Sequence, residues 1–217
     1  MPASRPAPDA LLLMGTHCPW CPRVLESLKE LLANGAIASL ETVNIDEQPE
    51  VAAELNVRTV PWVRIGPFEL EGMRSMAEMR EWAEKVGTEA GMTAWLGELL
   101  SSARIHQTVT LLRDDPAAIR ALLRLFASPD TPLNTRIGIS VVMEELAGSE
   151  TLLGVRDALG ELTAHEEARV RGDACHYLAM VGDPQAAAHI RPLLEDPDAH
   201  VREIAKESLE QLEQAPG

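Results

Sequence analysis

Two cysteines, Cys18 and Cys21, carry the clearest chemistry in this sequence. They flank Pro19 and Trp20 and directly follow the apolar run Ala10–Gly15, which predicts a buried strand. Behind them, apolar residues recur at helical spacing, at Val24, Leu25, Leu28, Leu31 and Leu32. A helix that begins inside the motif places both sulfurs near unpaired backbone N–H groups, which favour a thiolate over a thiol. The pattern predicts thiol–disulfide exchange, in which Cys18 attacks a disulfide and Cys21 resolves the mixed disulfide.

The elements around the motif alternate between strand and helix patterns. After the first strand, the predicted elements are a helix to about Asn34 that is capped by Gly35, a strand at Leu40–Ile45, a helix at Pro49–Leu55, two strands at Trp62–Ile65 and Phe68–Glu71, and a helix with Ser75 as its N-cap. The order βαβαββα predicts an α/β domain with helices on both faces of a four-stranded sheet.

The segment Thr59-Val60-Pro61 opens the third predicted strand. Together with the Cys-x-x-Cys motif, it makes residues 9–87 resemble the thioredoxin fold in its short glutaredoxin-like form. The resemblance implies that the Val60–Pro61 bond is cis and lies beside the cysteines, where both residues help to bind an extended substrate segment. The Cys-Pro-x-Cys-Pro pattern that Pro22 completes is most similar to protein disulfide oxidoreductases and to the N-terminal domain of the alkyl hydroperoxide reductase flavoprotein. These are thiol–disulfide exchangers, and no cofactor is implied for this chain.

Two features of these families have no counterpart here. The strand before the motif holds Leu11, Leu12 and Leu13, without the buried aspartate of thioredoxin. Residues 66–72 lack the Gly-Gly pair and the aspartate with which glutaredoxins hold glutathione, so glutathione dependence is not expected.

The neighbours of the cysteines leave alternatives open. His17 either helps to keep Cys18 as a thiolate or simply faces solvent, and Trp20 either contacts substrate or packs as a lid. An alternative role for the cysteine pair is as half of a zinc site, which would need two further ligands. Because Cys175 and the other five histidines lie beyond residue 87 without metal-ligand spacing, no metal is predicted.

Beyond Gly87 the pattern is entirely helical, with Asp-Pro and Gly-Asp turns between apolar stripes. Two segments 31 residues apart share one pattern, Val170-Arg171-x-x-Ala174-x-x-x-Leu178 and Val201-Arg202-x-x-Ala205-x-x-x-Leu209. Their spacing puts valine, alanine and leucine on one helical face. Partner helices are predicted at Gln185–Leu194, Leu152–Leu162 and Pro116–Phe126. These pairs resemble HEAT repeats, which stack into an all-α solenoid and present an extended surface to protein partners.

Three residues of the repeats have structural interpretations. Arg171 and Arg202 occupy the same repeat position, and we expect them to form ion pairs or carbonyl caps with aspartates of the neighbouring repeat. Cys175 lies where the last repeat has Lys206. Because the terminal repeat leaves this face open to water, we expect Cys175 to be an inert thiol buried between repeats; the alternative is a third redox centre.

Composition excludes several classes of function. The formal net charge of −15 argues against nucleic acid and anionic membrane as partners. Three cysteines are too few for a disulfide-stapled scaffold, and the apolar run before the motif is too short for a signal-peptide core or a membrane span. We expect a cytoplasmic protein with a flexible tail at residues 1–8, a redox domain at 9–87 and a HEAT-type domain at 88–217.

The sequence thus supports two hypotheses of different classes. In the first, the protein is an enzyme that exchanges disulfides with protein clients, using electrons from an unidentified donor, and the HEAT domain binds the client or a partner. In the second, the chain is a partner-specific adaptor in which the solenoid carries the main function and the redox motif serves one partner.

Overall fold

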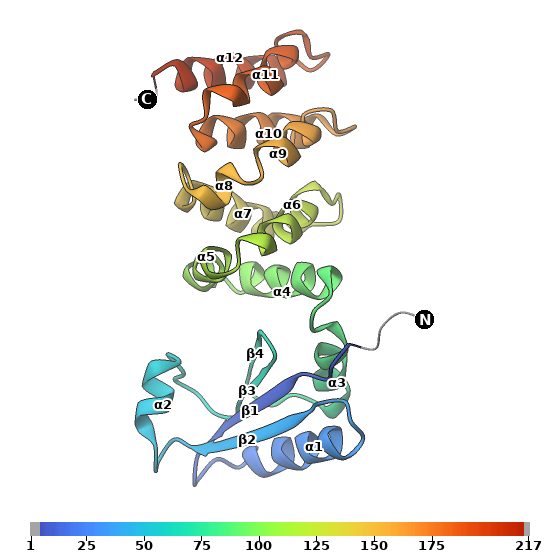
Figure 1. Ribbon diagram of the computed structural model, residues 1–217, viewed down its shortest axis with the longest axis vertical. Helices are drawn as coiled ribbons and strands as arrows, with labels where there is room; N and C mark the ends of the chain where they lie inside the picture. The colour runs from blue at the N-terminus through green and yellow to red at the C-terminus, as the bar shows by residue number, and fades with distance from the viewer. Residues whose placement is uncertain (1–4, 215–217) are drawn as a thin grey trace. The chain divides into compact units, whose positions relative to one another are not determined.

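The structure, a computed structural model, describes residues 5–214 and divides into two compact units at Met92. The first unit contains the predicted α/β domain (Figure 1). Its elements are β1 Asp9–Met14, α1 Cys21–Ala33, β2 Ser39–Asn44, α2 Pro49–Glu54, β3 Trp62–Ile65, β4 Phe68–Glu71 and α3 Met76–Lys85. The order βαβαββα is the predicted one, and the fold class is confirmed.

Four strands form one sheet in the order β2-β1-β3-β4, with β1 parallel to β2 and antiparallel to β3. Leu11 and Leu13 pack in one cluster with Ala52 of α2 and Trp62 of β3. Leu12 points to the opposite face, because side chains alternate along a strand. The helices α1 and α3 contact each other and the sheet. Helices therefore cover both faces.

Local signals in the sequence explain where the helices of this unit begin and end. Ser75 Oγ accepts a hydrogen bond from the Glu78 N–H at 3.2 Å, and the Glu78 carboxylate accepts one from the Ser75 N–H at 2.9 Å, which is a complete capping box. Gly35 follows α1 with a φ of +76°, a conformation that glycine adopts without steric cost. Both predicted caps are confirmed.

The segment at 1–8 that was expected to be a flexible tail is described only from Arg5 onward. Residues 5–8 form no regular element. The carbonyl of Pro8 nevertheless accepts a hydrogen bond from the Ala38 N–H at 2.8 Å, and the Arg5 guanidinium donates to the carbonyl of Val86 at 3.2 Å. The predicted domain boundary at Gly87 lies between α3 and the next helix.

The chain beyond α3 is helical, and its first helix spans the division at Met92. In chain order its elements are α4 Glu89–Ser101, α5 Ile105–Asp114, η1 Pro116–Ala118, α6 Ile119–Ala127, α7 Leu133–Glu145, α8 Glu150–Leu153, α9 Arg156–Leu162, α10 Ala168–Val181, η2 Pro184–Ala186, α11 Ala187–Ile190, η3 Arg191–Glu195 and α12 Ala199–Gln214. None of the helices described between residues 5 and 214 is long and apolar enough to cross a bilayer.

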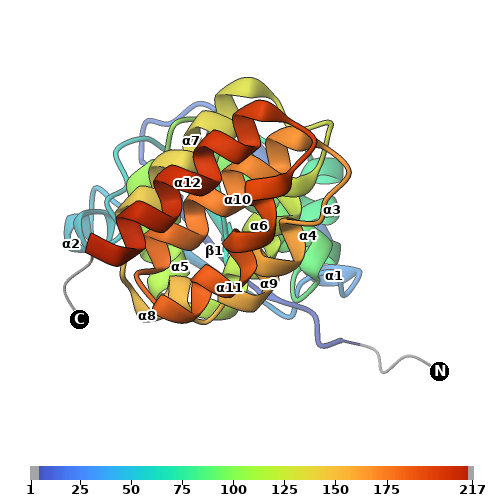
Figure 2. The same cartoon turned by 90° about the horizontal axis from the view of Figure 1, so that it is seen from above.

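The repeat face predicted from sequence packs as expected. Val170, Ala174, Val201 and Ala205 are all buried, and α10 lies beside α12 (Figure 2). A methyl group added at Gly172 would come within 3.0 Å of the Ile204 side chain, so the two helices approach closely.

All three predicted partner helices are divided. Residues 116–126 begin as η1 and continue as α6. Residues 185–194 form η2, α11 and η3 rather than one helix, because Pro192 has no N–H to donate to the carbonyl of Ala188. Residues 152–162 divide at Gly154 and Val155 into α8 and α9. Glycine is a weak helix former, and after the break Arg156 pairs with Asp183 of the next repeat.

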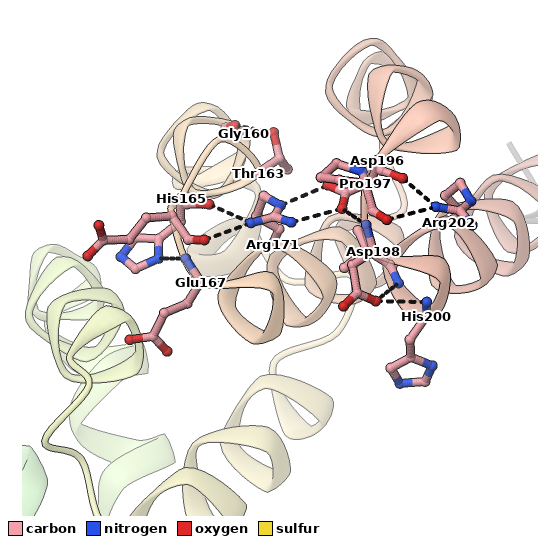
Figure 3. A network of polar contacts seen from close by, with 12 residues as sticks. Gly160, Thr163, His165, Glu167, Arg171, Asp196, Pro197, Asp198, His200 and Arg202 are labelled. Carbon is pink, nitrogen blue, oxygen red and sulfur yellow. Dashed lines mark hydrogen bonds and ion pairs between the residues drawn. The ribbon is translucent and has the colours of Figure 1, made fainter.

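An arginine–aspartate pair joins the last two repeats (Figure 3). The Arg171 guanidinium donates to both carboxylate oxygens of Asp196, at 2.7 Å and 2.8 Å, and both side chains are largely buried. Its remaining edge donates to the carbonyls of His165 and Glu166, at 3.0 Å and 2.9 Å. The expected ion pair and carbonyl cap are therefore both present.

Arg202 repeats half of this arrangement 31 residues later. Its guanidinium donates to the carbonyls of Asp196 and Pro197, at 2.6 Å and 3.1 Å, as Arg171 does to the equivalent carbonyls (Figure 3). Cys175 is fully buried, and burial raises the pKa of its thiol to about 11. The expectation of a buried core thiol is confirmed.

The Arg171–Asp196 pair leads to a prediction about stability. Asp196→Ala should lower the free energy of unfolding by about 3 kcal/mol, because it leaves a mostly buried guanidinium without its carboxylate. Urea unfolding followed by circular dichroism measures this. Glu203→Ala, which breaks only an exposed contact with His200, should cost less than about 0.5 kcal/mol. Equal effects of the two changes would contradict the assignment.

The same pair predicts how stability depends on pH. The Arg171 hydrogen bonds lower the pKa of Asp196 in the folded protein. Its contribution is therefore complete above the carboxyl pKa of the unfolded chain, about 4, and is lost as the pH falls below that value. The stability difference between the wild type and Asp196→Ala should shrink over that acidic range.

Candidate active site

The two cysteines of the motif lie at the N-terminus of α1. They are joined in a disulfide with their Cα atoms 5.5 Å apart, and α1 begins at Cys21. Pro22 stands in the first turn, where a missing N–H costs no helical hydrogen bond. The Cys21 N–H donates to Cys18 Sγ at 3.2 Å. After reduction, this N–H and the positive end of the helix dipole favour a thiolate on Cys18.

The two sulfurs differ in exposure. Cys18 lies in the turn before the helix and is half-buried, whereas Cys21 is 0 % exposed. Trp20, between them, is 53 % exposed. An external disulfide can therefore reach Cys18, while Cys21 is positioned to attack only a sulfur that is already attached to Cys18.

The loop before β3 packs against the turn that carries Cys18. Its Val60–Pro61 peptide bond is cis, and Pro61 is buried. A methyl group added at Gly15 would lie 3.3 Å from Val60 Cγ2 and 3.9 Å from Cys18 Cβ. Glycine at position 15 thus lets the two loops meet beside the redox pair. The Pro61 carbonyl accepts a hydrogen bond from the Gly72 N–H at 2.9 Å, which holds this loop to the end of β4.

A carboxylate, Asp46, holds the same turn from the other side. It accepts a hydrogen bond from the Thr16 N–H at 2.7 Å, and the Asn44 amide donates to Thr16 Oγ1 at 3.1 Å. The backbone and side-chain hydrogen bonds of Thr16 lower the pKa of Asp46, and the charge of His17 adds to that effect. The loop after β2 therefore fixes the loop after β1.

Comparison with known families agrees with this geometry. A family model described as a thioredoxin domain matches residues 10–84, and one described as HEAT repeats matches residues 142–210. The chain carries a thioredoxin-like domain followed by HEAT repeats. A search of curated proteins finds no match to the chain. The HEAT match covers the repeats that were aligned from sequence and extends back into α7.

The structure brings some of the sequence-predicted site residues of the thioredoxin-like domain together. Val60 and Cys18 both lie close to Gly15, Cys21 is joined to Cys18 by the disulfide, and Pro61 follows Val60 in the same loop. Trp20 and His17 are both exposed at this end of the domain. Among residues 5–214, no three His, Cys, Asp or Glu side chains lie close enough together to hold a metal ion.

Asp46 is the site residue that sequence analysis missed. The prediction ended the second strand near it and gave it no role. A signal was nevertheless available in the predicted βαβ order, because two strands joined through a helix are usually parallel and the carboxyl ends of parallel strands lie at one edge. In the register observed, Met14 pairs with Asn44, so the residues that follow each strand are neighbours.

A second surface feature lies on α7 of the helical unit. Leu133, Ile137 and Val141 are 64 %, 58 % and 37 % exposed, and their spacing of four residues places them on one face of the helix. We call these three residues the α7 stripe. An exposed row of large apolar side chains is typical of a surface that contacts another protein.

The geometry predicts unequal reactivity of the cysteines once the disulfide is reduced. Iodoacetamide at pH 6 should label Cys18 well before Cys21 and Cys175, because Cys18 is accessible and accepts the helix N–H. A thiol with a pKa near 7 carries roughly 30-fold more thiolate at pH 6 than a free thiol. Mass spectrometry of the labelled peptides measures the order. Labelling of Cys21 first, or of all three at one rate, would contradict the assignment.

Proposed function

We propose that this protein is a thiol–disulfide oxidoreductase that acts on protein clients. The observation that carries the proposal is the Cys18–Cys21 pair at the N-terminus of α1, with Cys18 accessible and Cys21 fully buried. The thioredoxin-like domain supplies the fold, and the client reaction is inferred from the chemistry of the pair.

The reaction starts with reduced cysteines. The Cys18 thiolate attacks one sulfur of a client disulfide, a Cys18–client bond forms, and the other client sulfur leaves and takes a proton from water. Cys21 then loses its proton to water and attacks Cys18 Sγ. The Cys18–Cys21 disulfide forms, the client leaves as a thiol, and two electrons have passed from the pair to the client.

Each residue around the pair has a proposed part in this reaction. The Cys21 N–H and the N-terminus of α1 stabilise the attacking thiolate. Val60 and Pro61 border the approach to Cys18, where client backbone can lie beside the loop. Exposed Trp20 contacts the client, and exposed His17 helps to keep Cys18 as a thiolate.

A return to the reduced state requires a two-electron donor, either a small dithiol or the reduced cysteine pair of another protein. A reducing compartment such as the cytoplasm supplies such donors and keeps thiols reduced. We therefore propose that the protein acts in the cytoplasm.

We further propose that the HEAT repeats select the client. The α7 stripe supports this, because it offers apolar area that a second protein can cover. Binding area on the chain that carries the reactive thiol raises the local concentration of a chosen disulfide. The same stripe is the observation that favours the second candidate, an adaptor for one partner in which disulfide exchange is secondary.

A disulfide-reduction assay distinguishes the two candidates. With a small dithiol as electron donor, the wild-type protein should accelerate insulin reduction over many turnovers, and Cys18→Ser should return the rate to the uncatalysed value because the attacking thiolate is gone. Cys175→Ala, a cysteine change at a buried position, should keep the rate. No acceleration by the wild type would exclude a general reductase and favour the adaptor.

A trapping experiment tests the role of the stripe. Cys21→Ser removes the resolving thiol, so a client stays attached to Cys18. Adding Ile137→Glu should reduce recovery of the most abundant trapped proteins about tenfold, because a charge then faces the contact. Leu194→Glu changes an exposed leucine of the same unit that lies outside the stripe, and it should leave recovery unchanged. Equal recovery with both variants would show that the stripe does not select clients.

A further inference from the structure

The edge of the sheet beside Cys18 carries a negative charge that the exchange reaction described above does not use. A methyl group added at Gly15 would lie 3.6 Å from Asp46 Oδ2 and 3.9 Å from Cys18 Cβ. The carboxylate and the Cys18 side chain are thus both within 4 Å of one point. Asp46 Oδ2 and Cys18 Cβ are therefore less than about 10 Å apart, which is the distance over which exposed charges interact at 0.1 M salt.

Hydrogen bonds hold this carboxylate in place. Asp46 Oδ2 accepts the Thr16 N–H at 2.7 Å, and Thr16 stands two residues before Cys18. Asn44 binds both partners, since its Oδ1 accepts the Asp46 N–H and its Nδ2 donates to Thr16 Oγ1, each at 3.1 Å. The Thr16 hydrogen bonds lower the pKa of Asp46, so the group is ionised at neutral pH.

We propose that Asp46 is a positioning residue of the redox pair, and that its charge biases the pair toward the disulfide. The inference rests on the proposed function. The disulfide is neutral, whereas the reduced pair carries a negative charge when Cys18 is a thiolate. A fixed carboxylate nearby therefore raises the free energy of the reduced form alone. It acts against the N-terminus of α1, which stabilises the same thiolate.

Three other charged groups bear on the measurement. Glu47, next to Asp46 in the chain, accepts a hydrogen bond from Asn44 Nδ2 at 3.4 Å. His17 lies next to Thr16, and its charge interacts with Asp46 with the opposite sign. Glu50, in the first turn of α2, is also exposed and carries the same charge as Asp46. Glu50→Gln removes an equal charge without touching Thr16, so it serves as the matched control.

The test is the redox equilibrium of the full chain with reduced and oxidised glutathione at pH 7. Asp46→Asn keeps an oxygen that can accept the Thr16 N–H but removes the charge. It should raise the ratio of dithiol to disulfide about threefold at 0.05 M salt, and the change should shrink at 1 M salt, where charges are screened within about 3 Å. Glu50→Gln should leave the ratio within error of the wild type.

Three outcomes would overturn the inference: an unchanged ratio in Asp46→Asn at low salt, a shift toward the disulfide, or an equal shift in Glu50→Gln. The comparison is repeated with His17→Gln in every chain, and loss of the effect there would show that Asp46 acts only through His17. A purely structural role would slow exchange without moving the equilibrium. If the wild type does not accelerate insulin reduction with a small dithiol, the proposed function itself fails.

Discussion

The strand β1 pairs with β2 on one side and with β3 on the other, and the register of these two pairings decides where the active-site residues lie. At its carboxyl end, Met14 pairs with Asn44 of parallel β2, and Leu13 pairs with Trp62 of antiparallel β3. The chain leaving β1 toward the cysteines therefore runs between the residue that follows β2 and the residues that precede β3. A one-residue shift in either register would turn each side chain to the opposite face of the sheet and separate Asp46 or Val60 from the cysteine turn.

Local structure at the start of α1 then separates the roles of two chemically identical thiols. Cys21 is the first helical residue and is enclosed, and its N–H is directed at Cys18 Sγ. Cys18 remains in the turn, where it meets solvent and receives the field of the helix. The separation needs no buried acid, and Leu11 to Leu13 fill the strand beneath with apolar side chains. Charge near Cys18 instead comes from the surface, from the Asp46 and His17 loops.

Much of this could be predicted from the sequence, because the deciding signals are local. The β3–β4 hairpin at Trp62–Glu71 and the N-cap at Ser75 were predicted at the observed positions, and the helix start inside the motif follows from the apolar spacing. Asp46 could not be assigned in this way, since its role depends on a hydrogen bond to Thr16 across two strands. The break between α8 and α9 was likewise missed, because it accompanies a pair between Arg156 and Asp183 of different repeats.

Two exposed surfaces of the helical unit differ in polarity, the outer face of α12 and the α7 stripe. Stacking needs small or apolar residues between repeats, and α10 supplies Cys175 and Ala179, which are both buried. The same positions in α12 hold Lys206 and Glu210, which are exposed, and another repeat placed there would have to desolvate both charges. The face of α12 is therefore more polar than the corresponding face of α10. The α7 stripe is apolar where α12 is charged, so the proposed protein partner would bury more apolar area on α7 than on this face of α12.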